Sequence, residues 1–281
     1  MRTIHLICHP QWMKDEFSQT GIYQVKHSYG LEVPQHDAND LWWAPQTYAA
    51  KLNHALTRKS LQTVKFPGSG MEETVKSDIS QKIFSREVIL MTAEQALQSP
   101  EAGFWKYLDH KNDNFPAKYR TSREIVEDIS ENRITPEEKL LLCATKLDIV
   151  EEHRIFFNPQ KLASSMYVTT DSSGQQSTVY DGALQRIPSS EIETYFSEDI
   201  KPLLAKNFKI TAGVADIAVL KDGTMLLLEL NTPWSSAWYD CDMAVVHNTI
   251  EHVFTQKVTH WEPSKTLQAA IQSNPVILPM Q

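Results

Sequence analysis

Two carboxylates and an amide lie in a stretch whose sequence predicts a β-hairpin. Asp222-Gly223 separates the apolar runs 214–220 and 225–230. An Asp-Gly pair between apolar runs is a strong signal for a two-residue turn, because both residues tolerate the positive φ that such turns need. A two-residue loop predicts this register: Lys221 faces Thr224, Leu220 faces Met225, Ala218 faces Leu227, Asp216 faces Glu229 and Val214 faces Asn231.

Side chains alternate along a strand, so Asp216, Glu229 and Asn231 are expected on one face. The rest of the hairpin is apolar, with Met225 and Leu227 predicted on that face and Leu226, Leu228 and Leu230 on the other. Two like charges that face each other in a buried hairpin destabilise it unless something compensates them.

A divalent cation is one compensation, since Mg²⁺ takes one or two carboxylates together with phosphate oxygens and water, and an Asn side chain adds a neutral oxygen. The alternative is that one carboxylate pairs with a Lys or Arg and the other lies at a solvated end of the sheet.

The surrounding sequence predicts an α+β fold with antiparallel sheets. Capping-box patterns predict helices that begin at Thr92, Thr121 and Ser190, the last of them reaching about Phe208. Apolar runs predict strands at 3–8, 86–91, 104–108, 115–120, 139–144, 150–157 and 162–168, and a helix is expected over 242–254. We expect a small α/β lobe over residues 1–80 and a second domain over residues 81–281.

Composition narrows the function classes. The 281 residues carry 27 Lys and Arg against 35 Asp and Glu, a net charge of −8, which gives no reason to expect a nucleic acid or an anionic membrane as partner. The three scattered cysteines favour a reducing compartment. No stretch has the pattern of a secretory signal or the length of a membrane span, so a cytoplasmic location is expected.

With these motifs in place, the chain resembles the ATP-grasp superfamily, whose magnesium site is an acidic residue on one strand and Glu-x-Asn on the next. Here those motifs are VADIAVL with Asp216 and MLLLELN with Glu229 and Asn231. Upstream, REVILMTAEQA, FWKYLDHKNDNFPAKY and EEHRIFF follow in the order seen in a clade of amidoligases of the type with one arginine and two lysines.

That resemblance implies two α/β lobes with antiparallel sheets that enclose ATP and Mg²⁺. It further implies a carboxylate-amine ligase that works through an acyl phosphate. The expected partners are small-molecule, peptide or protein carboxylates and amines.

The resemblance also implies roles for single residues. Lys106 and, in the adjoining loop, Lys111 match lysines that contact the nucleotide phosphates, and Arg86 matches an arginine of the clade. Arg154 matches the arginine that holds a carboxylate or acyl phosphate, and the strand around Cys143 is expected against the adenine. Each cation could instead be an ordinary surface charge, and Arg154 could simply pair with a neighbouring glutamate.

Two features leave the assignment open. The loop 109–114 holds no glycine, although many members of the superfamily cover the phosphates with a Gly-rich loop. The stretch 232–239 is rich in hydroxyls and aromatics and could line an acceptor site or simply pack at a helix start.

Two other functions stay possible from sequence. Restriction-endonuclease-like nucleases place an Asp and a Glu-x-Lys on adjacent strands to hold magnesium, but Asn231 stands where lysine is usual. A nucleotide-binding module that has lost turnover is the other alternative, since fold does not establish activity.

Overall fold

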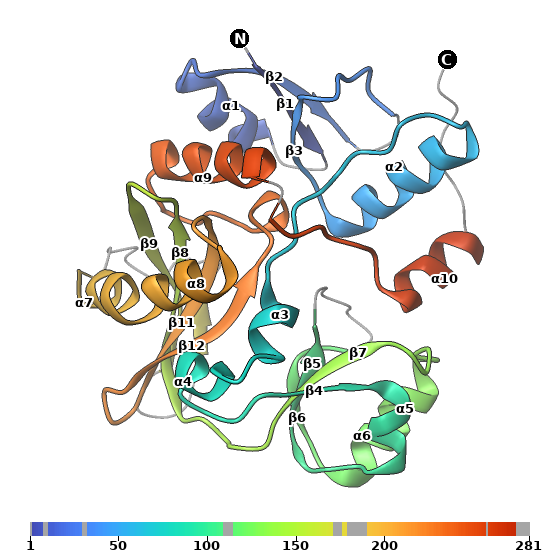
Figure 1. The fold of residues 1–281 in the computed structure, drawn as a ribbon, viewed down its shortest axis with the longest axis vertical. Helices are drawn as coiled ribbons and strands as arrows, with labels where there is room; N and C mark the ends of the chain where they lie inside the picture. The colour runs from blue at the N-terminus through green and yellow to red at the C-terminus, as the bar shows by residue number, and fades with distance from the viewer. Residues whose placement is uncertain are drawn as a thin grey trace.

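In the computed structural model, the first strand starts a parallel sheet. The structure describes residues 2–7, 11–29, 33–108, 115–170, 176–178, 190–256 and 258–273. The three-stranded sheet has the order β2-β1-β3 and lies at the top of Figure 1. We call these elements the N-terminal layer: β1 (Arg2–Ile7), α1 (Gln11–Gln19), β2 (Tyr23–Ser28), β3 (Leu41–Trp43) and α2 (Gln46–Arg58).

The core of the N-terminal layer is completed by residues from the other end of the chain. Trp42 and Trp43 pack in one apolar cluster with Trp234, Trp238 and Trp261. The same cluster takes in residues of α9 (Met243–Gln256) and α10 (Lys265–Ser273). A boundary at residue 80 therefore stays a prediction, because residues after 230 contribute to this core.

A four-stranded antiparallel sheet, the small sheet, forms the lower right of Figure 1. Its order is β4 (Ile89–Thr92), β7 (Lys139–Cys143), β5 (Gly103–Tyr107) and β6 (Lys118–Arg120). Helices α5 (Ala93–Gln98) and α6 (Ser122–Glu131) begin at the capping boxes predicted at Thr92 and Thr121.

A five-stranded antiparallel sheet, the large sheet, carries the predicted hairpin. Its order is β10 (Gln176–Thr178), β9 (Leu162–Thr170), β8 (Ile149–Phe157), β11 (Gly213–Leu220) and β12 (Met225–Asn231). An apolar cluster on one face joins it to short helices: α3 (Met71–Val75), α4 (Ser80–Phe84), α7 (Ser190–Tyr195), the π-helical η2 (Phe196–Ile200) and α8 (Lys201–Phe208). The 3₁₀ turn η3 (Pro233–Ser235) follows β12.

The third capping box is a correction. Ser190 is already the first helical residue of α7, and Glu193 accepts hydrogen bonds from the backbone N–H and hydroxyl of Ser164 at 3.1 and 2.9 Å. The glutamate therefore fastens the helix to β9 instead of capping it.

The predicted α+β class with antiparallel sheets is confirmed, with the parallel sheet of the N-terminal layer as an addition. Cys143 and Cys241 are buried free thiols, whereas Cys8 lies outside the described residues. Across the described parts of the chain, every helix is too short or too polar to cross a bilayer.

Candidate active site

The β11–β12 hairpin brings the predicted residues face to face. Asp216 pairs with Glu229 and Val214 pairs with Asn231, as predicted. Nearer the turn the predicted register is wrong, because Ala218 faces Leu226 and Val219 faces Met225.

The loop causes this difference. It has three residues, Lys221 to Gly223, since the backbone N–H of Leu220 donates to the carbonyl of Thr224 at 2.8 Å. Gly223 takes the positive φ of 84° that closes such a loop. A bulge between Asp216 and Ile217 adds one residue on β12 and restores the predicted pairing beyond it.

The bulge also changes which leucines share a face. Leu227 pairs with Ile217 and lies with Leu230 in the apolar cluster under the helices. The prediction that placed Leu227 beside Glu229 and apart from Leu230 is therefore wrong. The face that carries Asp216 is more polar near the acids than the predicted register implied.

Arg154 on β8 faces Asp216 directly across the sheet. Its Nε and Nη2 donate to the two carboxylate oxygens at 2.8 Å each, and Nη1 donates to the carbonyl of Ala237 at 3.2 Å. Both side chains are almost fully buried. Burial alone would lower the pKa of Arg154, but the charge and hydrogen bonds of Asp216 raise it above its usual value, so Arg154 stays charged.

Asn231 and Lys106 continue this network. The Asn231 amide Nδ2 lies 2.9 Å from an oxygen of Asp216 and 2.9 Å from one of Glu229. Lys106, which comes from the small sheet, forms an ion pair with the other oxygen of Glu229. Arg154, Asp216, Asn231, Glu229 and Lys106 thus form one continuous polar chain from the large sheet to the small one.

The alternative interpretation of the acids is partly right, because in this structure each carboxylate has a cationic partner: Arg154 for Asp216 and Lys106 for Glu229. The two pairs differ in exposure. The Lys106 and Glu229 side chains keep 24% and 16% of their surface exposed, whereas the Arg154 and Asp216 side chains keep 4% and 1%. The Glu229 end of the chain is therefore the end that a ligand can reach.

The Arg86 side chain contacts the backbone of β12 at the bulge. Its Nη1 and Nη2 donate to the carbonyls of Leu227 and Leu228 at 2.7 and 3.2 Å. Burial lowers the pKa of Arg86, and the neighbouring Cys143 thiol opposes that shift. Cys143 ends β7, where it pairs with Phe104 of β5 and is buried. The structure thus brings Arg86 and Cys143 together, but both Nη atoms of Arg86 already donate hydrogen bonds to backbone carbonyls.

Lys111 and the rest of the loop 109–114 lie outside the described residues. The structure therefore places Lys106, and the prediction for Lys111 stays a prediction.

Two tyrosines that sequence analysis did not single out flank Arg154. Tyr167 and Tyr239 stack with ring centroids 4.9 Å apart, and the Arg154 guanidinium carbon lies 5.2 and 5.1 Å from them. Tyr239 adopts a left-handed φ of 52°, an uncommon backbone for a bulky residue. Burial and the nearby acids raise the pKa of Tyr167, and its protonated hydroxyl donates to Glu152 at 2.6 Å.

Sequence held a partial signal for one of the two. Tyr239 belongs to the stretch 232–239 that was considered for an acceptor site, although Trp234 and Trp238 of that stretch are core residues. Tyr167 gave none, because a register shift at Glu152/His153 in the β8–β9 ladder sets the position of its side chain.

The side chains of Asp216, Glu229 and Asn231 are of the types that bind magnesium. Carboxylate and amide oxygens are hard ligands, and the three side chains lie within hydrogen-bonding distance of one another. Asn231 turns its Nδ2, and not its oxygen, toward both acids. Among the described residues, no group of three or more His, Cys, Asp and Glu could hold a metal, in keeping with a site of only two acids. In this structure Lys106 pairs with one oxygen of Glu229, and both oxygens of Asp216 accept hydrogen bonds from Arg154.

Comparison with solved structures shows the fold. The structure is similar to D-cycloserine synthetase DcsG with a TM-score of 0.55 at 10% identity, over 92% of this chain and 100% of that one. It also resembles D-alanyl-alanine synthetase A from Vibrio cholerae, with a TM-score of 0.48 at 13% identity over 89% and 98% of the two chains. No curated protein matches the sequence. The fold is that of the ATP-grasp enzymes, which are ATP-dependent ligases.

The sequence adds the family. Residues 83–249 match the family model for the ATP-grasp domain of the R2K clade, family 2. The chain therefore belongs to family 2 of the R2K clade, and the resemblance seen in its motifs is confirmed.

Proposed function

We propose that this protein joins a carboxylate to an amine with the use of ATP, through an acyl phosphate, and that the product is an amide or peptide bond. The observation that supports this most is the polar chain from Arg154 to Lys106. It crosses from the large sheet to the small one, between the two sheets where the fold would hold a nucleotide.

Lys106 and Glu229 are proposed to act at the phosphates. The Lys106 ammonium is a compact charge on the exposed side of the chain, suited to phosphate oxygens and to the charge that develops in phosphoryl transfer. In that step Lys106 leaves Glu229, which frees a carboxylate oxygen beside Asn231. With its amide turned over, Asn231 would hold a magnesium ion together with Glu229 and an oxygen of Asp216 that Arg154 also binds, and the ion would neutralise the phosphate charge.

Arg154 is proposed to act mainly by position. Three of its donors are occupied by Asp216 and the carbonyl of Ala237, so a substrate oxygen would have to share the guanidinium with them. In this arrangement Arg154 holds Asp216 in place and lends positive charge to the acyl phosphate. Arg86 and Cys143 are proposed to shape the nucleotide side of the site from behind β12. Lys111, in the loop between β5 and β6, is proposed to contact phosphate.

A carboxylate oxygen of the substrate attacks the γ-phosphorus of ATP, the bond from that phosphorus to the oxygen shared with the β-phosphate breaks, and ADP leaves. The amine then attacks the acyl carbon of the resulting acyl phosphate. The new C–N bond forms, the C–O bond to phosphate breaks, and the amine proton leaves with the phosphate or to solvent. Positioning and electrostatic stabilisation account for the acceleration, and no residue of the described chain has to act as a covalent nucleophile.

The test follows oxygen atoms. Carboxylates labelled with ¹⁸O are incubated with amines, ATP and Mg²⁺, and the inorganic phosphate is analysed by mass spectrometry. An acyl phosphate route transfers one label from the carboxylate to phosphate. Formation of ADP with unlabelled phosphate and no amide would overturn the proposal. Glu229→Gln should abolish formation of the amide and of the labelled phosphate.

A further inference from the structure

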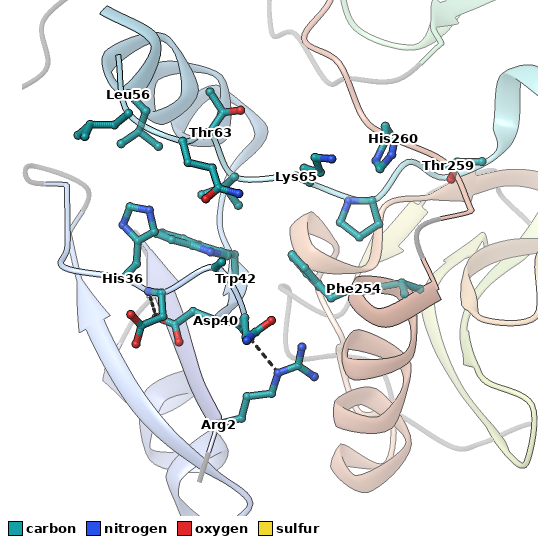
Figure 2. Close-up of a pocket in the computed structure, with 18 residues that line it drawn as sticks. Arg2, His36, Asp40, Trp42, Leu56, Thr63, Lys65, Phe254, Thr259 and His260 are labelled. Carbon is teal, nitrogen blue, oxygen red and sulfur yellow. Dashed lines mark hydrogen bonds between the residues drawn. The ribbon is translucent and has the colours of Figure 1, made fainter. Parts of the chain in front are cut away.

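A pocket opens between the N-terminal layer and the end of α9 (Figure 2). It has a volume of about 450 Å³, within the usual range for small-molecule sites. Its walls come from the starts of β1 and β3, the loop before β3, the end of α2 with the segment after it, and the end of α9. None of the residues placed above in the candidate active site lines it.

One wall of this pocket presents a buried carboxylate. The Asp40 side chain is only 7% exposed, and its Oδ2 accepts hydrogen bonds from His5 Nε2 at 2.8 Å and from the backbone N–H of Asp37 at 3.0 Å. Its other oxygen accepts no hydrogen bond from the residues that the structure describes. Burial lowers the pKa of His5 despite the opposing effect of Asp40, so the ring is uncharged at neutral pH.

A positive charge comes from a different segment. Lys65 lines the pocket, and within the described ranges its ammonium makes no ion pair or hydrogen bond. The chain around it is held on both sides: Asn53 bonds the N–H and carbonyl of Val64 at 2.9 and 2.8 Å, and Trp261 N–H donates to the carbonyl of Phe66 at 2.8 Å. In the view of Figure 2, Asp40 and Lys65 come from separate segments on two sides of the pocket.

Part of the pocket lining is apolar and aromatic, and Arg2, Asn39 and Thr63 are among the polar residues that line the rest. Leu56, Val253 and Phe254 form the apolar part, together with Trp42, whose ring is fixed by stacking on His5 at 4.3 Å. A bound molecule would thus meet a negative side chain in Asp40, a positive one in Lys65 and the apolar part of the pocket wall.

We propose that this pocket binds a small zwitterion with an apolar body, of the amino acid or short peptide kind, with its ammonium on Asp40 and its carboxylate toward Lys65. The Asp40 oxygen that lacks a donor gains one, and the desolvation cost of that buried carboxylate is offset. This site is separate from the one proposed for ATP, so it can exist whether or not the ligase chemistry is correct.

The test uses the full-length protein and leucyl-leucine in isothermal titration calorimetry. Binding should be saturable, and an N-acetyl cap or a C-terminal amide should each weaken it about tenfold or more, since each removes one charge-assisted contact. Lys65→Gln should weaken the free dipeptide by a similar factor and abolish the preference for a free carboxylate over the amide. That variant changes an exposed side chain, so loss of folding is not expected.

Two control variants locate the effect. Lys59→Gln changes another exposed lysine, one that does not line the pocket, and should leave binding unchanged. Glu229→Gln should also leave it unchanged. The proposal is overturned if leucyl-leucine does not bind, if the caps make no difference, or if Glu229→Gln abolishes binding while Lys65→Gln keeps it.

Discussion

Arg154 and Asp216 form a two-point ion pair in the middle of the large sheet. Nε and Nη2 of the arginine each donate to a different oxygen of the carboxylate at 2.8 Å, on strands that lie side by side. Both side chains are almost fully buried. Removal of one partner would therefore leave an uncompensated charge in the core.

We expect Arg154→Met to lower the free energy of unfolding by about 3–5 kcal/mol, the range for a buried pair that loses one member. Urea denaturation followed by circular dichroism measures this. The double variant Arg154→Met/Asp216→Leu should cost much less than the sum of the two single variants, because no unpaired charge remains. Additive costs would contradict the pair as described.

Loss of the ion pair between Lys106 and Glu229 should affect stability much less than loss of the pair between Arg154 and Asp216. The Lys106 and Glu229 side chains are partly exposed, so Lys106→Met should change stability by less than about 1 kcal/mol. If Lys106 contacts phosphate, the same variant should reduce kcat/KM for ATP by about a hundredfold or more.

A matched control for Lys106 is Lys118→Met. Lys118 also pairs with an acid, Asp128 at 3.2 Å, but on β6 and with 48% of its side chain exposed. It should leave both stability and turnover nearly unchanged. Equal activity in the two variants would remove Lys106 from the proposed site.

Arg86 supplies donors to two backbone carbonyls at the bulge of β12, the edge strand of the large sheet. Arg86→Met should destabilise the protein by about 1–3 kcal/mol, because the carbonyls of Leu227 and Leu228 lose those donors. The exposed Arg123, which pairs only with Glu127 on its own helix, provides the control variant Arg123→Met. Thermal unfolding compares them. If Arg86→Met keeps full stability but loses nucleotide affinity, the arginine binds nucleotide and does not brace the bulge.

His247 predicts a pH dependence of stability. It is fully buried against Phe17, and neither ring nitrogen has a hydrogen-bond partner among the described residues. Burial lowers its pKa from 6.5 to about 4. Between these values the unfolded chain binds more protons than the folded one, so stability rises with pH across this window and is lost as the pH falls.

The neutral His247 ring should contribute about 3 kcal/mol of stability at pH 7 that is lost by pH 4, because a tenfold change in proton affinity corresponds to about 1.4 kcal/mol. Urea midpoints over that range, in wild type and His247→Phe, measure it. The variant should show the weaker pH dependence. An unchanged slope would mean that other groups cause the loss at low pH.

Local features of this chain could be predicted from sequence. The capping boxes at Thr92 and Thr121 depend on residues three apart, and both are formed. The facing of Asp216 and Glu229 was also predicted, but the reasoning was incomplete. Two departures offset each other, a loop one residue longer than expected and a bulge in β12. A bulge leaves no fixed pattern in a sequence, so the offset could not be foreseen.

Contacts between distant segments could not be predicted from sequence. The pairing of Arg154 with Asp216 depends on β8 lying beside β11, and sequence gives the strands without their order. The ion pair of Lys106 with Glu229 depends in turn on how the two sheets meet. All five residues of the polar chain were nevertheless named from sequence. Asp216, Glu229 and Asn231 came from the predicted hairpin, whereas the roles of Lys106 and Arg154 came from the resemblance to the superfamily.

The most direct test of the proposed site is the magnesium dependence of nucleotide binding. Calorimetry with a non-hydrolysable ATP analogue, in Mg²⁺ and in EDTA, compares wild type with Glu229→Gln. Wild type should bind about tenfold or more tightly with Mg²⁺, and Glu229→Gln should lose that difference while it keeps the weaker binding seen in EDTA. Equal affinity of wild type in Mg²⁺ and EDTA, or no binding at all, would contradict the account.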